Sequence, residues 1–298
     1  MLAAALGVAT CIAVADVRAA SIPTVQAQKT AFTPHRALYR MELGSSTQGS
    51  DVVDASGTMF YRFEPLCDGW EVESRVALRL HYGSTGAAPE VVETTWTFTS
   101  FESYDGTDFT YAVDHKRNGL VQEAFAGEAG KDDMGGGASF NDEEFTSVNL
   151  PVGTLFPAEH LMRLLAHARR GNGPFKRVVF DGASIDNPYE VNAFVVGPVQ
   201  DGDVMAGNTS AEPEKTPAAL LVGASSATGT AGLNAGRKIW RVRMAYFPML
   251  AVEDLPDFEL EIDYRDDGIA ERMIQDFGDF TLNLTPSRLE VLPPPECK

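Results

Sequence analysis

This sequence has few residues that could take part in catalysis or metal binding and are also spaced as such a site requires. His160 and His167 lie seven residues apart in a predicted helix, roughly 10.5 Å by helical rise, which is too far for both to bind one small metal ion. The sequence holds no phosphate-cradling G-x-x-x-x-G-K loop, no G-x-S-x-G nucleophile elbow and no H-E-x-x-H pair. We therefore predict no catalytic residues, no cofactor and no metal, and we do not expect an enzyme.

Acidic clusters offer a second possible chemistry, calcium binding. The segment 263–268 superficially resembles a calcium loop, but Arg265 stands where the third ligand belongs and Ile274 where the closing glutamate belongs. We interpret that segment as a hairpin turn. The carboxylates at 132–133 and 142–144 could bind calcium weakly, and a solvated acidic surface is the simpler interpretation.

Two polar segments could face a ligand. His35 and Arg36 precede or open the first predicted strand, and Glu159 and His160 open the predicted helix. The histidines could be pH-sensitive or ligand-facing; histidines hydrogen-bonded at the ends of elements are the more common case. The helix dipole accounts for Glu159. A hydrolase centred on His160 is the least favoured of the functions we consider.

The cysteines indicate an oxidising compartment. Once a predicted export segment is removed, Cys67 and Cys297 are the two that remain. In an exported protein the simplest outcome is one disulfide, which would close a ring of about 230 residues, worth ~5 kcal/mol at most by loop entropy. Two free thiols, one of them in a loose tail, are the alternative.

Residues 1–20 have the features of a secretory signal peptide. The run 2–15 is small and apolar, and Val17-Arg18-Ala19 before Ala20 resembles a cleavage site. Because no lysine or arginine precedes the run, we expect the true start upstream. Thr10 fits poorly before a lipidated cysteine, which argues against Cys11 as an anchor. No later segment approaches the ~20 apolar residues of a membrane-spanning helix, so we expect a periplasmic protein.

The charge balance limits the partners. The chain has 42 Asp and Glu against 24 Lys and Arg, a net charge of −18. Such a surface repels phosphate backbones and anionic headgroups, so nucleic-acid binding is excluded. A cationic or zwitterionic partner stays open, and so does a surface charge that serves only solubility.

Period-two alternation runs through the chain and predicts an all-β fold. It is clear in 70–80, 92–98, 109–113, 240–246, 260–264 and 280–284. Strands with one buried and one wet face imply antiparallel pairing. Asp105-Gly106, Asn118-Gly119 and Asp267-Gly268 are dipeptides typical of type I′ hairpins. Roughly a dozen strands would close or nearly close a sheet.

One segment has helical spacing, and two others look loose. Pro157 to Arg170 predicts an amphipathic helix that plugs or caps the sheet, with Pro157 at its start and Gly171 at its end. Residues 126–141 and 202–236 are rich in glycine and small residues. We expect a signal peptide at 1–20, a lead-in at 21–34 and one β domain at 35–298 with a surface insertion at 202–236.

Several motifs together resemble one family. They are the strand start His35-Arg36-Ala37-Leu38-Tyr39, the strand 57–63, Cys67-Asp-Gly-Trp70, the segment 153–160 with its L-F-P-x-E-H sequence, and a cysteine near the C-terminus. This pattern is similar to the EipB family, cell-envelope integrity proteins of alphaproteobacterial periplasms long described as a domain of unknown function. The resemblance covers about residues 30–298.

The resemblance implies a β-spiral, a long antiparallel sheet wrapped on itself with a helix packed against it, as in carriers of the LolA/LolB type. It implies the Cys67–Cys297 disulfide and a non-enzymatic role in envelope integrity. Our leading hypothesis is a concave sheet that binds a lipid, lipoprotein or peptide. The alternative is a scaffold that docks a periplasmic partner through its acidic surface or a sheet edge. The aromatic residues that could line the interior, or simply form the core, are Trp70, Trp96, Phe98, Tyr111, Trp240 and Tyr246.

Overall fold

The computed structural model describes residues 32–83, 90–142, 145–199, 237–249 and 255–297. The predicted signal peptide at 1–20, most of the lead-in at 21–34 and the insertion at 202–236 lie outside these ranges. Among the described residues the fold is one antiparallel sheet of fourteen strands with a single helix.

The first eight strands precede the helix, and six follow it. The first group is β1 (His35–Ser46), β2 (Val52–Pro65), β3 (Gly69–Tyr82), β4 (Glu90–Ser103), β5 (Asp108–Arg117), β6 (Leu120–Asp132), β7 (Gly135–Phe140) and β8 (Ser147–Leu150). The helix is α2 (Pro157–Arg170). The second group is β9 (Gly173–Val179), β10 (Tyr189–Pro198), β11 (Ile239–Pro248), β12 (Phe258–Arg265), β13 (Ala270–Asp276) and β14 (Phe280–Val291).

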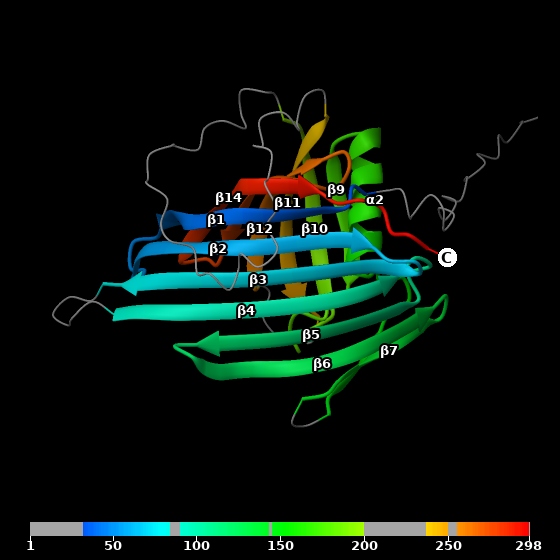
Figure 1. Ribbon diagram of the computed structural model, residues 1–298, viewed down its shortest axis with the longest axis horizontal. Coiled ribbons are helices and arrows are strands. Elements are labelled where there is room, and N and C mark those ends of the chain that lie inside the picture. Colours follow the sequence, from blue (N-terminus) through cyan, green and yellow to red (C-terminus); the bar gives the residue numbers. More distant parts are fainter. Residues whose placement is uncertain (1–31, 84–89, 143–144, 200–236, 250–254, 298) are drawn as a thin grey trace, which may run out of the picture.

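The strand order is β8-β7-β6-β5-β4-β3-β2-β1-β14-β13-β12-β11-β10-β9. The first and last strands of the chain are therefore neighbours in the middle of the sheet, and the two edges come from the middle of the chain. The sheet curls so strongly that β10 to β12 cross behind β1 to β3 (Figure 1). It does not close, because β8 and β9 do not pair. This is the predicted near-closed, barrel-like spiral.

The predicted alternation is confirmed by the pairing. Trp70, Val72 and Val76 lie on the inner face of β3, and the carboxylates of Glu71 and Glu73 lie on the outer face with Arg62. On the inner face, Val76 stands opposite Met59 on one side and Trp96 on the other. Each strand therefore buries one row of apolar side chains, as the period of two requires.

All three predicted hairpins are present, between β4 and β5, β5 and β6, and β12 and β13, but the predicted type I′ turn is present at one of them. At Asn118-Gly119 both residues have positive φ, 51° and 78°, as a type I′ turn requires. At Asp105-Gly106 and Asp267-Gly268 only the glycine does. Local side-chain hydrogen bonds explain the difference at the first of these, where Asp105 accepts from Ser103 and Thr107 at 2.6 and 2.8 Å and supports another turn type.

The prediction that 126–141 is loose was wrong. These residues form the end of β6, a tight turn and β7. The glycines are needed for close backbone approach. A Cβ at Gly127 would lie 2.1 Å from the carbonyl oxygen of Ser139, and one at Gly136 would lie 2.1 Å from that of Gly130.

The helix forms over the predicted residues and connects the two edge strands. Leu155, just before α2, pairs with Val179 at the end of β9 in parallel, so the chain bridges the opening of the sheet at this point. Pro157 is at the start, and the N–H of Gly171 donates to the carbonyls of His167 and Ala168 at the end. Leu164 and Leu165 are buried in the core.

The interior consists of two apolar clusters. The larger joins β1 to β3, α2 and β9 to β14, and the smaller joins β4 to β8 with Phe156 and Phe180. The disulfide between Cys67 and Cys297 is present, with Cα atoms 5.4 Å apart, and joins the β2–β3 turn to the segment after β14.

Candidate functional site

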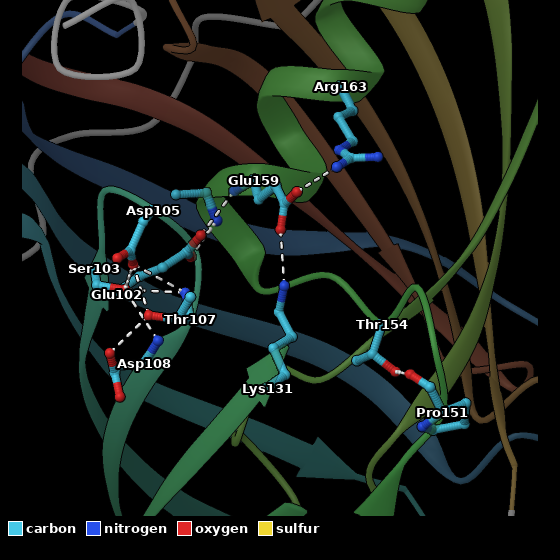
Figure 2. A network of polar contacts seen from close by, with 11 residues as sticks. Glu102, Ser103, Asp105, Thr107, Asp108, Lys131, Pro151, Thr154, Glu159 and Arg163 are labelled. Atoms are coloured by element: carbon cyan, nitrogen blue, oxygen red, sulfur yellow. Dashed lines mark hydrogen bonds and ion pairs between the residues drawn. The ribbon is translucent and has the colours of Figure 1, made fainter. Parts of the chain in front are cut away.

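The start of α2 is held by a carboxylate from a distant strand. The N-cap residue is Phe156, whose side chain cannot accept a hydrogen bond, so the first N–H groups need another acceptor. Glu102 of β4 supplies it: its carboxylate accepts from the N–H of Ala158 at 2.6 Å and of Glu159 at 2.9 Å (Figure 2). The helix dipole favours a negative charge at this position.

Burial opposes that negative charge. Glu102 is only 4% exposed, and desolvation raises the pKa of its carboxyl to about 7, against the lowering effect of its two hydrogen bonds and of Lys131. Glu159 adds a smaller raising effect. Glu102 is therefore a buried carboxylate that titrates close to neutral pH.

Glu159 extends this network into the helix. Its carboxylate binds Lys131 Nζ at 3.0 Å and Arg163 at 2.6 Å (Figure 2). Lys131 Nζ also lies 4.8 Å from the centre of the Phe156 ring, a cation–π contact. The helix dipole alone explains Glu159 from the sequence, and the structure adds these ion pairs. The pair with Lys131 joins β6 to α2.

The neighbouring β4–β5 turn is organised by its own side chains. Asp105 accepts hydrogen bonds from the hydroxyls of Ser103 and Thr107, which hold the pKa of its carboxyl below the ordinary value. Ser103 in turn accepts from the backbone N–H of Asp108 at 2.9 Å. These contacts are local and fix the turn beside Glu102 (Figure 2).

His160 lies on the buried side of α2. Its ring centre is 5.7 Å from that of Phe175 on β9, and that of His167 is 5.4 Å from the same ring. Among the described residues neither Nε2 atom has a hydrogen-bond partner. Burial, with a contribution from Arg177, lowers the pKa of His160 to about 4, so its imidazole is neutral.

His35 and Arg36 have structural contacts on β1. The buried His35 ring donates from Nδ1 to the carbonyl oxygen of Thr33 at 2.8 Å and packs against Tyr61, and burial lowers its pKa. Arg36 forms a two-pronged pair with Glu290 of β14 at 2.9 to 3.0 Å. The four polar positions from the sequence lie in separate places: His35 and Arg36 on the β1 side, Glu159 and His160 on α2.

The six predicted aromatic residues divide between the two clusters. Trp70 stacks on Phe63 at 4.9 Å, Trp240 is buried, and Tyr246 stacks on Phe258 at 4.4 Å, all in or against the larger cluster. The remaining three, Trp96, Phe98 and Tyr111, belong to or pack against the smaller one. The structure does not bring all six together.

The concave face of the larger cluster is only partly covered. Its partly exposed apolar side chains are Leu43, Met59, Tyr61, Val72, Val76, Leu78, Leu80, Tyr246, Leu260, Tyr264 and Phe280. Four phenols lie among these side chains or beneath them, those of Tyr39, Tyr61, Tyr246 and Tyr264. Tyr39 donates to the carbonyl oxygen of Ala270 at 2.8 Å. Burial raises the pKa values of Tyr61 and Tyr264, and the Tyr264 phenol raises that of Tyr61 further.

The sequence did not identify this tyrosine group. Tyr61 and Tyr264 are on strands four places apart in the sheet order, so only the curling of the sheet brings them near one another. A second unpredicted group lies below Tyr39: the buried Arg265 pairs with Asp267 at 2.8 Å and lies 3.5 Å from Glu271. The concave face thus combines apolar walls with neutral hydroxyl groups.

The described residues contain neither a candidate membrane-spanning helix nor a candidate metal cluster. In that part of the chain no helix is long and apolar enough to cross a membrane. Within the same ranges no group of three or more His, Cys, Asp and Glu side chains is placed to hold a metal ion.

A curled, nearly closed antiparallel sheet with one helix bridging its edges and an apolar concave face defines a class of barrel-like β proteins. The structure has a TM-score of 0.71 with the crystal structure of a β-barrel-like protein of the domain of unknown function DUF1849 from Brucella abortus. That likeness covers 89% of this chain and 100% of the other, at 20% identity.

The sequence comparisons narrow this class. The model of the EipB-like family matches residues 26–293. The chain is 25% identical over 257 residues to the cell envelope integrity protein EipB of Brucella abortus (strain 2308), which covers 84% of this chain and 81% of that protein. The chain belongs to the EipB-like family.

Proposed function

We propose that this protein acts in the periplasm, without enzymatic activity, to support the integrity of the cell envelope, and that it does so by holding a lipid, lipoprotein or peptide against its concave face. The named role of the Brucella relative supports the envelope part of the proposal. A disulfide between distant parts of the chain supports an oxidising compartment.

The observation that carries the ligand part is the partly exposed apolar row on β2, β3 and β12. Apolar side chains there are left accessible, whereas the inner residues of β10 such as Val191 and Val195 are fully buried. Concave surfaces with apolar walls are typical of ligand sites. Phenol hydroxyls among apolar walls suit an amphiphile, which needs both apolar contact and a few hydrogen bonds.

Native purification followed by solvent extraction and lipid mass spectrometry tests this proposal. Val76→Asp on the inner face of β3 should greatly reduce the ligand recovered, because it places a charge on the apolar row. Ala77→Asp is the matched control: it is the next residue of the same strand and points to the other face. Folded wild-type protein that carries no ligand, or equal recovery from both variants, would contradict the proposal.

A second candidate function, docking of a periplasmic protein, is favoured by one specific observation. β8 lies at one edge of the sheet, and among the described residues no strand pairs with its outer side. The outer surface beside it is acidic.

A further inference from the structure

The two edges of the sheet are protected to very different degrees. On β9 the carbonyl of Val178 accepts from the N–H of Leu155 at 2.9 Å, and Phe180 donates to Leu155 at 3.0 Å. Pro174 and Lys176, further along the same edge, are residue types that discourage strand pairing. The helix packs beside this strand as well (Figure 1).

The other edge, β8, has none of these devices within the strand, and Pro151 directly after it removes one further N–H. Its four residues, Ser147 to Leu150, include no proline and no charged side chain. The N–H of Phe140 donates to the carbonyl of Thr146 at 2.8 Å, so by antiparallel alternation Val148 and Leu150 pair with β7. The N–H and C=O groups of Ser147 and Asn149 therefore point away from the sheet, and no described residue pairs with them.

Large apolar side chains flank this edge. Phe145, two residues before β8, is 75% exposed, and Val152, two residues after it, is 67% exposed. Phe145 also has a φ of 53°, a conformation that is uncommon and costly for a bulky residue. Strain that holds an aromatic ring outward is typical of functional positions.

The outer surface beside the edge is hollowed and acidic. A groove of about 540 Å³ crosses β5 to β8, and it is open there because Gly130, Gly137, Ser139 and Ser147 have little or no side chain. The ionisable side chains that line it are Asp108 and Glu128. No described lysine or arginine lines it.

We propose that the β8 edge adds a strand from a partner protein, and that the strand is an extended basic segment. Ser147 and Asn149 supply its backbone hydrogen bonds, Phe145 and Val152 contact its apolar side chains, and the carboxylates of the groove attract its cationic ones. This inference develops the second candidate function and is independent of ligand binding on the concave face.

A blocked, fluorescein-labelled octapeptide of alternating valine and lysine is a suitable probe. Fluorescence anisotropy should show binding that weakens as salt is raised. Two peptides of equal length serve as controls: one replaces lysine with glutamate, and one is N-methylated at every residue, which removes the N–H donors from both edges of the strand. Neither control peptide should bind measurably.

Asn149→Pro removes an outward N–H without removing a bond to β7, and it should weaken probe binding roughly ten-fold. Lys176→Pro makes the same change on the β9 edge and should leave binding unchanged. Should Asn149→Pro fail to fold, Phe145→Asn is the second variant, since asparagine tolerates positive φ; it should weaken binding about five-fold. Amide exchange at Ser147 and Asn149 should slow when the peptide is added to the wild-type protein.

Three results would overturn the proposal: no binding of the valine–lysine peptide, equal binding of the N-methylated peptide, or no effect of both Asn149→Pro and Phe145→Asn. A fourth such result would come from light scattering: a wild-type dimer that Asn149→Pro converts to a monomer would identify a second copy of this chain as the occupant of the β8 edge. The amount of lipid recovered from Asn149→Pro should equal that from the wild type. The strand-addition proposal and the ligand proposal can therefore fail independently of each other.

Discussion

Glu102 shows how a single residue can set the response of an element to pH. Both carboxylate oxygens accept helix N–H groups, which favours the ionised form, while complete burial favours the protonated form. The balance raises the pKa from 4.5 to about 7. A carboxyl whose folded pKa is raised contributes stability below pH 4.5, and that contribution is lost as the pH rises toward 7.

Glu102→Gln tests this balance. The glutamine does not titrate, so the free energy of unfolding of the wild type relative to the variant should fall between pH 4.5 and 7, on the order of 3 kcal/mol in all. Denaturant unfolding at several pH values measures the difference. Glu90→Gln, at the exposed start of β4, is the matched control for the loss of one carboxylate from the same strand. A difference that rises with pH would mean that the hydrogen bonds and the helix dipole outweigh burial.

For His160 we expect the free energy of unfolding to change with pH in the opposite direction. Burial lowers its pKa from 6.5 to about 4, so the neutral ring contributes stability above pH 6.5 that is lost as the pH falls toward 4. His160→Phe keeps an aromatic ring against Phe175 and removes the titration. The wild type should therefore lose stability relative to this variant on acidification over that range, as chemical denaturation would show. If the free energies of unfolding of the wild type and His160→Phe changed with pH in the same way, water would have to reach the His160 ring.

At the scale of the element, both groups fix the first turn of α2: Glu102 accepts its N–H groups, and His160 packs against Phe175 of β9. Because the pH windows overlap and the slopes oppose each other, the two effects largely cancel between pH 4.5 and 6.5. We expect the docking of α2 in the wild type to depend little on pH in this range. The free energy of local opening of α2, obtained from amide exchange after division by the intrinsic exchange rate at each pH, should be nearly constant in the wild type and should become pH-dependent in either variant.

The helix also shows what a sequence can and cannot predict. Leu161, Leu164, Leu165 and Ala168 have helical spacing, and Pro157 and Gly171 mark the ends, so the bounds were predictable from local residues. Its cap was not, because Glu102 comes from a strand 56 residues earlier. The signal was indirect: Phe156 cannot cap a helix, so an acceptor from elsewhere was required.

The strands were predictable in type and face, and the site was not. Alternation placed Val72 and Val76 on the inner face correctly, because the period of two is a local property. The meeting of Tyr61 with Tyr264 depends on how far the whole sheet curls, which no local pattern states. Glycine-rich 126–141 was misjudged because close backbone contact and looseness give the same composition.

At the scale of the whole molecule, the disulfide acts mainly on the unfolded chain. In the native state β14 is already paired with β1, and the N–H of Leu292 donates to Pro34 at 2.8 Å, so the bond restrains only a short tail. In the unfolded state it closes a loop with a sequence separation of 230.

Removal of the disulfide should therefore lower stability with little change in structure. We expect Cys67→Ser with Cys297→Ser to cost about 2–5 kcal/mol, measured by thermal unfolding, with near-ultraviolet circular dichroism unchanged. Reductant should lower the Tm of the wild type and leave that of the double variant unchanged. A wild-type Tm insensitive to full reduction would contradict this account.

The strand order has a consequence for how the protein is made. Read from β9 through β14 and then β1 to β8, the sheet is a plain up-and-down meander, so the natural chain is a circular permutation of the simplest topology. A chain that emerges from its N-terminus first presents β1 early, and the strand that covers its open side, β14, arrives last. Until synthesis is complete β1 therefore has an unsatisfied edge in the centre of the future sheet, and the cell must keep that edge from pairing elsewhere until the final strand is made.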